Sequence, residues 1–355
     1  MQDQTKKRIL VAPLNWGLGH ATRCIPLINA LLKNNFEPVI ASDGSALKLL
    51  KKEFPELKSV ELPSYNITYP KKGQFFKLKM LQNSPKLIKA IKAEKKATKF
   101  IIQDLGIDGI LSDNRLGVHS KHIPCVFMTH QLKVLSGNTT WLSTKMHQKI
   151  IKRFNECWVP DNNGEDNLSG ELGHTDVLGI PLKYIGPLSR LKKQDCQIKY
   201  DLMVLLSGPE PQRTLLQNLL LKELDRFKGK ILFVKGILDG ESNASINGNM
   251  TSYNFMTSDA LEKALNESKL VLSRSGYTTV MDLAKLEKKA FFIPTPGQFE
   301  QEYIADRLTN LGQVPSCKQN EFKIEMLNEI EDFSGLKSTD YSTNYKKLFS
   351  LFKGK

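Results

Sequence analysis

The sequence has few cysteines and no long hydrophobic run. Its five cysteines are widely spaced and never form a Cys-x-x-Cys pair, which argues against a disulfide framework and a structural zinc site and favours a reducing cytoplasm. The longest apolar stretches, such as Ile9–Leu14, are far shorter than the ~20 residues of a transmembrane helix. The N-terminal residues lack the apolar core and the cleavage site of a signal peptide. We therefore expect a cytoplasmic protein.

Arginine is scarce in a chain that is otherwise strongly basic. Of the 51 basic residues nine are arginines, which leaves 51 − 9 = 42 lysines, and the formal net charge is +14. Lysine is a point charge that is poorly suited to reading the edges of bases, and the sequence holds no nucleic-acid-binding motif. We therefore expect no nucleic-acid partner.

The positive charge is concentrated in one segment, Tyr65–Lys99, which holds ten lysines and one acid, Glu94 (10 − 1 = +9). Within it Leu87, Ile88 and Ile91 are at helical spacing. An apolar stripe flanked by lysines can bind an anionic membrane, here at the inner face of the cell membrane, as a peripheral contact. The same pattern is typical of a helix with a solvated lysine face and an apolar face in the core. The sequence leaves both interpretations open.

The chain is long enough for two domains, and its 355 residues are 40% hydrophobic and 25% charged, as in globular proteins. In each half, short apolar runs such as Arg8–Pro13 and Asp201–Leu206 alternate with helical patterns. This alternation predicts an α/β fold with two Rossmann-like βαβ domains, each a parallel sheet covered on both faces. We expect an N-terminal domain over 1–185, a linker over 186–200, a C-terminal domain over 201–335 and a C-terminal helix within 336–355 that can pack back on the N-terminal domain.

A glycine-containing turn, Asn15–Arg23, follows the first predicted strand. Gly17 and Gly19 let the backbone turn sharply and approach a bound molecule, and the N-terminus of the following helix favours an anionic ligand. Thr22 stands where a dinucleotide-binding fingerprint would have its third glycine. His20 is suited to proton abstraction near neutral pH, or else it only caps the helix.

A second strand–turn–helix pattern spans Ser273–Asp282. Its small hydroxyl residues can hold a phosphate at the helix start, Arg274 adds positive charge, and Asp282 can accept hydrogen bonds from a ribose diol. Two further polar loops also follow predicted strands. Pro294–Tyr303 offers Gln and Glu side chains that can bond sugar hydroxyls, and the other loop is Ser207–Gln212. Taken singly, these two are ordinary loops.

Polar residues end two strands of the N-terminal half. Asp113 and Asn114 follow the apolar run Gly109–Ser112, and His130 ends the next predicted strand. Ligands of open α/β sheets collect at such positions. Asp113 can orient His20, bind an acceptor or cap a helix, and His130 can line the same crevice or serve the core. The remaining histidines and acids are not spaced as a metal set, so we expect no metal ion, and the absence of a Gly-x-Ser-x-Gly elbow argues against a serine hydrolase.

Taken together, the motifs of the second half resemble the family 28 glycosyltransferases of GT-B fold. That family has the pattern Arg-Ser-Gly-x-x-Thr-x-x-Glu, then a strand ending in Val-Pro, then a paired Gln-Gln. The corresponding residues here, with Asp and Glu in place of the last Glu and Gln, are Arg274, Ser275, Gly276, Thr279, Asp282, Ile293, Pro294, Gln301 and Glu302. Gly17-x-Gly19-His20 corresponds to the Gly-rich loop of the family's acceptor side, so the resemblance extends over nearly the whole chain.

The resemblance implies a set of donor-binding residues. They are Ser207, Gly208, Phe255, Met256, Arg274, Ser275, Gly276, Thr279, Asp282, Gln301 and Glu302. In this set Asp282 would hold the uridine ribose, Gln301 and Glu302 the donor sugar, and Ser275 and Gly276 the diphosphate. The uracil would pair with backbone near Phe255 and Met256. On the acceptor side we expect Gly17, Gly19, Asn114 and His130.

We therefore expect an inverting, metal-independent glycosyltransferase of the cell envelope, with its active site between the two domains. It would move a sugar, N-acetylglucosamine by resemblance, from a UDP-sugar to a hydroxyl of a glycan or lipid-linked acceptor, with His20 as general base and Asp113 beside it. No cofactor is expected besides the donor. Gly19-His20-x-x-Arg23 also resembles nucleotide-sugar hydrolases of the same fold, in which the histidine activates water. A non-catalytic subunit that binds a nucleotide sugar is a third hypothesis.

Overall fold

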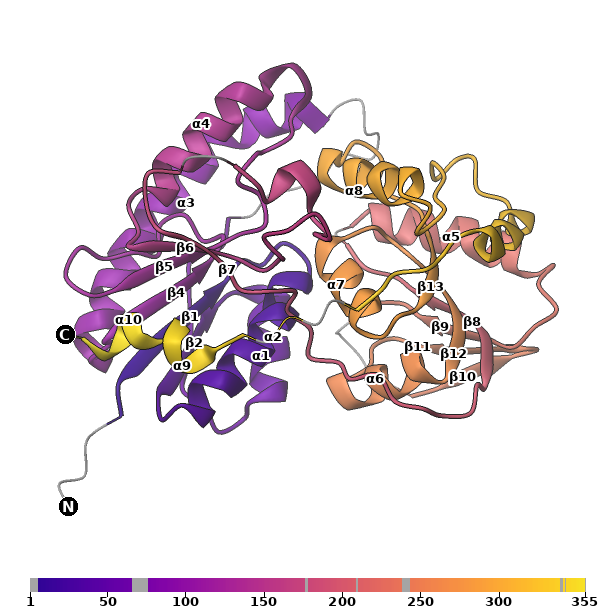
Figure 1. Cartoon of the computed structure of the whole chain (residues 1–355), viewed down its shortest axis with the longest axis horizontal. Helices are drawn as coiled ribbons and strands as arrows, with labels where there is room; N and C mark the ends of the chain where they lie inside the picture. The colour runs from indigo at the N-terminus through magenta and orange to yellow at the C-terminus, as the bar shows by residue number, and fades with distance from the viewer. Residues whose placement is uncertain are drawn as a thin grey trace. The chain divides into compact units, whose positions relative to one another are not determined.

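The computed structural model describes residues 6–65, 76–175, 178–208, 210–237, 243–338, 341 and 343–354, and gives only the backbone for 76–85. These residues form two compact units (Figure 1). The first lies within the ranges 1–67, 80–188 and 341–355, and the second lies within 68–79 and 189–340. The change of unit between Leu188 and Ser189 falls inside the segment expected to be a linker, and the end of the chain belongs to the first unit.

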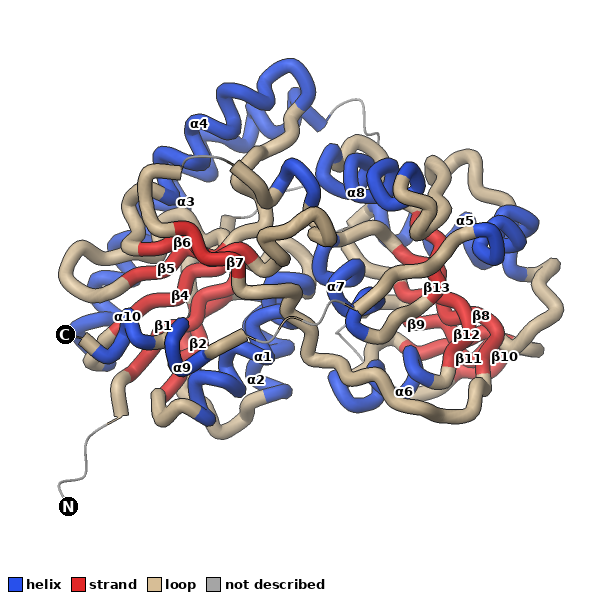
Figure 2. Tube along the Cα trace, in the orientation of Figure 1, coloured by secondary structure: helices blue, strands red, loops and turns tan. Residues whose placement is uncertain are grey.

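The described part of the first unit is built on a seven-stranded sheet in the order β3-β2-β1-β4-β5-β6-β7. All of its neighbouring strands pair in parallel. The strands are β1 (Arg8–Pro13), β2 (Glu37–Ser42), β3 (Ser59–Glu61), β4 (Gly109–Asp113), β5 (Cys125–Met128), β6 (Glu156–Val159) and β7 (Leu182–Tyr184). The helices are α1 (Gly19–Lys33), α2 (Gly44–Glu53), α3 (Phe76–Leu105, which belongs to this unit from Met80 on), α4 (Thr140–Ile151), α9 (Tyr345–Leu348) and α10 (Ser350–Lys353), with single 3-10 turns η2 (Gly137–Thr139) and η3 (Gly170–Leu172). The predicted doubly covered parallel sheet is confirmed: Figure 2 draws its strands in red among the blue helices.

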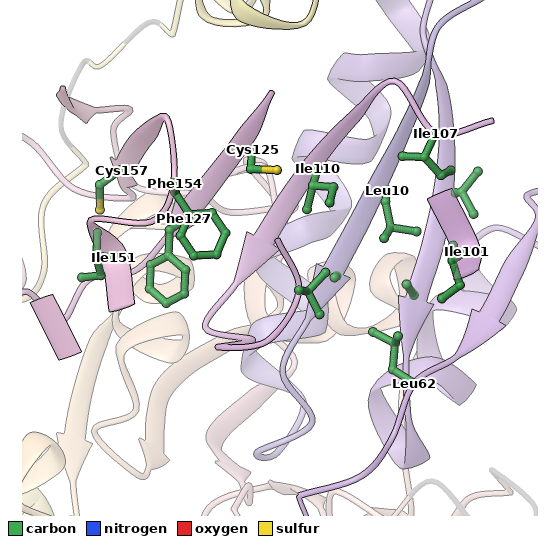
Figure 3. Close-up of a cluster of buried hydrophobic side chains, with 14 of the residues drawn as sticks. Leu10, Leu62, Ile101, Ile107, Ile110, Cys125, Phe127, Ile151, Phe154 and Cys157 are labelled. Carbon is green, nitrogen blue, oxygen red and sulfur yellow. The ribbon is translucent and has the colours of Figure 1, made fainter. Parts of the chain in front are cut away.

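The central strands of this sheet are buried on both faces because helices cover each side. On one face Leu10 and Ile110 pack with Ile101 of α3, and Phe127 packs with Ile151 of α4 (Figure 3). Removing each such side chain from water contributes about 1.5–3 kcal/mol to the stability of the folded state. The same cluster contains the thiols of Cys125 and Cys157, which behave as small apolar residues.

The end of the chain covers part of the same unit with aromatic rings. Phe349 and Phe352 lie with their ring centroids 5.8 and 6.4 Å from that of Phe36, in edge-to-face geometry. Their centroids lie 6.2 and 6.0 Å from that of Trp158 on β6. The expected C-terminal helix is present as two short helices, α9 and α10.

The second unit has a six-stranded sheet in the order β10-β11-β9-β8-β12-β13, parallel except for the β10–β11 pair. Its strands are β8 (Tyr200–Leu205), β9 (Ile231–Val234), β10 (Ser245–Asn247), β11 (Met250–Tyr253), β12 (Ser268–Ser273) and β13 (Lys289–Phe292). Its helices are α5 (Gln212–Leu224), α6 (Ser258–Asn266), α7 (Tyr277–Lys285) and α8 (Phe299–Asn310), with the 3-10 helix η4 (Ile324–Asp332). On one face of the sheet, α5 and η4 pack on Val204, Phe233 and Phe291.

The basic segment Tyr65–Lys99 is described only in part, because residues 66–75 lie outside the described residues. Leu87 and Ile91 pack on the small buried cluster of Leu14, Tyr65 and Ala90. These two members of the apolar stripe therefore belong to the core, as the second interpretation of this segment requires. A third member, Ile88, is 56% exposed.

Candidate functional site

Two loops meet at the edge of the first sheet where its strand order reverses. The chain leaves β1 and β4 side by side at this edge, because the two strands pair in parallel through Pro13 and Asp113. Such a reversal leaves a crevice that ligands of α/β sheets occupy. In the loop after β1, Gly17 has a φ of 77°, which favours glycine, and a side chain there would meet nothing within 4 Å. Asn15 ties this loop to the start of α2 by donating to Asp43, the N-cap residue of that helix, over 3.2 Å.

His20 lies in the first turn of α1, which begins at Gly19. Its Nδ1 is 3.0 Å from Oδ1 of Asp113, the last residue of β4. The Asp113 side chain is fully buried, whereas that of His20 is 14% exposed. The structure therefore brings together the two residues that were expected to be catalytic, and the His20 side chain remains partly exposed.

Arg23 also belongs to this cluster; it was named in the motif Gly19-His20-x-x-Arg23 but was given no role of its own. It lies one turn after His20 on α1, and its guanidinium grips both oxygens of Asp113, with Nε 2.7 Å from Oδ2 and Nη2 in contact with Oδ1. Residues three apart share a helix face, so the spacing Gly-His-x-x-Arg was the signal for this pairing. A buried two-pronged ion pair fixes the orientation of the carboxylate.

His130 joins the same cluster from the end of β5, because Nη1 of Arg23 lies 3.0 Å from its Nδ1. Its side chain is buried, at 4% exposure. Asn114 follows Asp113 with a φ of 58°, a conformation that asparagine tolerates better than most residues, and it is partly buried. Of the expected acceptor-side residues, His130 thus contacts the His20 cluster through Arg23.

The charges of this cluster shift its acid–base equilibria. Burial lowers the pKa of His20 and the charges of Arg23 and His130 lower it further, while Asp113 opposes them, so that the result lies below the ordinary value of 6.5. Burial alone would raise the pKa of the Asp113 carboxyl, but Arg23 and His20 outweigh burial and hold that pKa well below its usual range. At neutral pH the cluster therefore contains a carboxylate, a guanidinium and an uncharged imidazole at His20.

In the second unit, three loops leave one edge of the sheet, because β8, β11 and β12 run in parallel through β9. These loops contain the expected donor residues Ser207 and Gly208 after β8, Phe255 and Met256 after β11, and Gly276 after β12. The order of the parallel strands reverses at β8 and β12, so this edge has the crevice geometry of a ligand site.

Gly276 is the residue that precedes α7, and as a glycine it has no side chain with which to cap the helix. A Cβ atom on Gly276 would lie 3.9 Å from Nε2 of Gln301 and 4.0 Å from Oγ1 of Thr279. Three of the expected donor residues therefore surround one point at the N-terminus of a helix. N–H groups and the positive end of a helix dipole bind anions such as phosphate.

Arg274 has a different place from the one expected at a diphosphate. It is fully buried, and its guanidinium donates to the carbonyl oxygens of Ile293, Pro294 and Gln212 and to Oε1 of Gln319, over 2.7–3.0 Å. Because these bonds hold the guanidinium inside the unit, direct contact with a ligand is contradicted. Its charge nevertheless lies two residues before Gly276 in the chain.

Ser275 is also turned inward: its hydroxyl donates to the carbonyl oxygen of Gln301 over 2.8 Å and is fully buried. Oε1 of Gln301 accepts from the N–H of Thr295 over 2.9 Å, which orients its amide. The carboxylate of Glu302 accepts from the N–H of Gly297 over 2.8 Å. The expected sugar-binding pair therefore also fixes the loop between β13 and α8.

Asp282 lies on α7 one turn beyond Thr279, and its Oδ1 accepts from the hydroxyl of Ser189 over 2.6 Å. Burial raises the pKa of this carboxyl, against the charge of Arg190 and the bond from Ser189. Arg190 was not among the expected residues. Its charge acts on Asp282, and its Nε and Nη1 are buried and have no hydrogen-bond partner among the described residues. Arg190 is therefore a further cation of the donor-side unit.

Within the described ranges, no group of three or more His, Cys, Asp and Glu side chains has the geometry to hold a metal ion. None of the helices described is both long and apolar enough to cross a membrane.

Comparison with known proteins adds evidence on the second half of the chain and on the whole. Residues 215–349 match the family description "Glycosyltransferase family 28 C-terminal domain". The chain is 25% identical over 322 residues to the UDP-N-acetylglucosamine--N-acetylmuramyl-(pentapeptide) pyrophosphoryl-undecaprenol N-acetylglucosamine transferase of Buchnera aphidicola subsp. Schizaphis graminum. That match covers 84% of this chain and 81% of the relative.

Solved structures show the same fold. The glycosyltransferase SnogD from Streptomyces nogalater superimposes with a TM-score of 0.63 at 14% identity, over 98% of this chain and 100% of that one. MurG from Acinetobacter baumannii superimposes with a TM-score of 0.56 at 13% identity, over 99% and 100% of the two chains. The predicted fold class is thus confirmed, and we conclude that the chain is a glycosyltransferase of GT-B fold that resembles family 28.

Proposed function

We propose that this enzyme transfers N-acetylglucosamine from UDP-N-acetylglucosamine to a hydroxyl of a glycan or lipid-linked acceptor, with inversion at the anomeric carbon. The observation that carries the proposal is the pairing of Nδ1 of the partly exposed His20 with Asp113 over 3.0 Å. A carboxylate that accepts the Nδ1 proton leaves the lone pair of Nε2 available, which is the arrangement of a histidine general base. In this proposal Nε2 takes the proton of the acceptor hydroxyl as its oxygen attacks the sugar.

The donor side supports a nucleotide diphosphate. The N-terminus of α7 at Gly276 offers the partial positive charge of a helix dipole, and Arg274 and Arg190 add full charges to the same unit. These groups would stabilise the negative charge that develops on the departing UDP, which is the largest task of such a site. Because the protein supplies this charge itself, we propose that no metal ion is required. UDP-N-acetylglucosamine is the donor in the name of the Buchnera relative.

A lipid-linked acceptor is reached at a membrane, and α4 supports peripheral contact. Trp141, Leu142 and Met146 are 67%, 52% and 62% exposed. The charge of Lys145 lies 4.2 Å from the centre of the Trp141 ring. From Leu132 to Asn155 the sequence has no acid and five basic residues, at 133, 145, 149, 152 and 153. Exposed tryptophan with flanking lysines suits the surface of an anionic membrane.

Vesicle sedimentation tests this contact. We expect the protein to sediment with vesicles that contain anionic lipid at low salt and to detach as salt rises. Lys145→Glu should weaken binding by roughly fivefold or more, because each lysine near the surface contributes about 1 kcal/mol. Lys222→Glu, on α5 of the second unit, is the matched control. Equal sedimentation of all three proteins would remove α4 from the proposal.

The assay that tests the reaction measures UDP release from UDP-N-acetylglucosamine with and without glycan and lipid-linked acceptors. Transfer predicts slow release that an acceptor accelerates, and the configuration of the product, read by NMR, should be inverted. Fast release without any acceptor would instead favour the hydrolase hypothesis, in which His20 activates water. Thermal stabilisation by UDP-, GDP- and dTDP-sugars ranks the donors, because a ligand of the native state raises its apparent stability. No stabilisation by UDP compounds would contradict the proposed donor.

A further inference from the structure

Arg23 connects three titratable side chains from three elements of the first unit. It is 2% exposed on α1, and it contacts Asp113 at the end of β4 through two nitrogens. Its Nη2 is also 2.8 Å from Nδ1 of His20, and its Nη1 is 3.0 Å from Nδ1 of His130. A surface pair would be free to rearrange, but a buried guanidinium with these contacts has a fixed orientation.

The chemistry of the guanidinium determines the tautomer of His130. Arginine has only N–H donors and no acceptor. The contact over 3.0 Å therefore requires Nδ1 of His130 to accept. An uncharged His130 then carries its proton on Nε2, and a doubly protonated His130 would lose this contact with Arg23.

At His20 two arrangements compete for the same nitrogen. Nδ1 either donates its proton to Oδ1 of Asp113 over 3.0 Å or accepts one from Nη2 of Arg23 over 2.8 Å. In the first arrangement the lone pair is on Nε2, and in the second the proton is there. A hydrogen bond from Nδ1–H to the ionised carboxylate of Asp113 is charge-assisted and therefore stronger than one between Nη2–H and a neutral imidazole nitrogen, while Nη2 of Arg23 donates one of its two hydrogens to the same Oδ1. This favours the first arrangement.

We propose that Arg23 is a positioning residue that holds the Asp113 carboxylate for His20 and, by neutralising it, keeps the resting imidazole uncharged with the Nε2 lone pair available. The inference rests on the proposed role of His20 as a base. It adds Arg23 to the proposed site and gives the two partners of His20 separate roles. Asp113 selects the tautomer of His20, whereas Arg23 offsets the negative charge of Asp113 that acts on the imidazole. His130 serves as the acceptor for the remaining arm of Arg23.

The effects of Arg23 and Asp113 on the protonation of His20 can be measured separately, because their charges are opposite. The titratable groups that face it are Asp113, Arg23 and His130, and the thiol of Cys24 lies 3.8 Å from Oδ2 of Asp113. The guanidinium opposes protonation of His20 and the carboxylate favours it. Loss of the positive charge at Arg23 therefore moves the titration of His20 to higher pH, and loss of the negative charge at Asp113 moves it to lower pH.

NMR of the wild-type enzyme labelled with 15N-histidine tests the inference without activity and without risk to the fold. His20→Gln and His130→Gln spectra assign the signals. We expect Nδ1 protonated and Nε2 unprotonated at His20, and the reverse at His130. A resting His20 with its proton on Nε2, or a His130 with its proton on Nδ1, would overturn the inference whether or not the enzyme transfers sugar.

The pH dependence of variants tests the division of labour. Arg23→Gln should move both the NMR titration of His20 and the acidic limb of kcat/KM to higher pH, whereas Asp113→Asn should move the titration to lower pH and reduce kcat by roughly 10²-fold or more. Arg23→Lys keeps the charge but not the two-pronged grip, so it should titrate His20 like the wild type and release the tautomer of His130. An equal shift in Arg23→Lys and Arg23→Gln, or no shift in either, would contradict the assignment.

Far-UV circular dichroism of each variant shows which ones fold, and the conservative Arg23→Lys keeps the test available if Arg23→Gln unfolds. The outcomes separate the inference from the proposed function. A His20→Ala enzyme with normal turnover would end the general-base proposal while the predicted tautomers still hold in the wild type. Wrong tautomers with an inactive His20→Ala enzyme would end only the role of Arg23.

Discussion

Each unit has a buried arginine just after the strand at which its sheet order reverses. The two guanidinium groups are stabilised by different kinds of partner. Arg115 follows β4, and its guanidinium pairs with the carboxylates of Asp43 over 2.6 Å and Glu94 over 2.7 Å. Arg274 follows β12, and its acceptors among the described residues are uncharged carbonyl and amide oxygens. Neither side chain is exposed.

The two units therefore differ in the net charge around their buried arginines. In the first unit positive charges meet negative ones, at Arg115 with Asp43 and Glu94 and at Arg23 with Asp113, so the local charge is small. In the second unit the charge of Arg274 is solvated by dipoles and acts over distance in a medium of low dielectric constant. The first arrangement suits an uncharged hydroxyl and an uncharged base, and the second suits an anion.

The variant His20→Ala tests whether catalysis and UDP binding are divided between the two units. We expect kcat to fall by about 10²–10⁴-fold, the usual contribution of a general base, with little change in the affinity for UDP, because His20 belongs to the first unit. Steady-state kinetics and isothermal titration with UDP measure the two effects. His122→Ala is the matched control, since His122 is exposed. A parallel loss of UDP affinity would mean that the two tasks are not divided between the units.

The second test compares the two arginines directly. Arg115→Met should destabilise the protein by about 3–5 kcal/mol, because it leaves Asp43 and Glu94 buried without their partner. Burial already raises the pKa of Glu94, against the effects of Arg115, Tyr65 and Gly117. The destabilisation should therefore shrink as the pH falls and the carboxylates take up protons. Urea unfolding from pH 7 to pH 5 measures it.

Arg274→Met leaves only neutral acceptors unpaired, so its smaller destabilisation should not depend on pH in that range. If both variants showed the same dependence on pH, the distinction between charged and uncharged partners would be wrong.

The third test concerns the backbone cradle of the second unit. Gly276→Ala should fold normally, because its new methyl group meets its neighbours at ordinary contact distances of 3.9 and 4.0 Å and the φ of −67° suits any residue. We expect the affinity for UDP to fall about tenfold, or 1.4 kcal/mol, and the affinity for uridine to change little, because the methyl group stands where the phosphate would approach. Gly164→Ala, with open space around it, is the control. Unchanged UDP affinity would place the diphosphate elsewhere.

The smallest expected effect is a dependence of UDP affinity on pH. Burial raises the pKa of Asp282 above its usual 3.8, so this carboxyl takes up a proton at a higher pH than an ordinary aspartate. As the pH falls through that range, the charged acceptor for the ribose is lost and UDP affinity should weaken. Asp282→Asn should bind UDP a few-fold more weakly at neutral pH and should lose this dependence. Titrations with UDP at several pH values measure both; an unaltered profile in the variant would exclude Asp282 as the cause.

The fold was predictable from the sequence where strands are buried on both faces. Continuous apolar runs such as Arg8–Pro13 and Ile231–Val234 have no alternative to the interior of a parallel sheet. The short strands β7, β10 and β11 were not foreseen, because they are half-buried or exposed and one contains only Ser-Ile-Asn. Such segments become strands through their neighbours rather than through their own composition.

The residues of the candidate site and the pairing of His20 with Asp113 were predictable from the sequence, but the arginine partners were not. His20, Asp113 and Gly276 were found from their places after strands, which the topology of a parallel sheet dictates. The role of Arg23 was not foreseen and Arg190 was missed, because a sequence does not show which arginine is buried or beside which acid. Arg274 was assigned to the ligand for the same reason, although its partners are carbonyl oxygens of its own unit. The roles of these three arginines depend on contacts in the folded structure. Only for Arg23 does the spacing in the sequence give an indication.

The aromatic contacts of Phe349 and Phe352 with Phe36 and Trp158 have a consequence for biosynthesis. The strands of the first unit are translated early. The rings of Phe349 and Phe352, which cover part of that unit, are translated only after the entire second unit. Domains that are continuous in sequence can fold one after the other as they emerge. In the first unit, the apolar surface at Phe36 and Trp158 instead stays uncovered until the end of the chain is made. We therefore expect the nascent chain to be most prone to aggregation while the second unit is being translated.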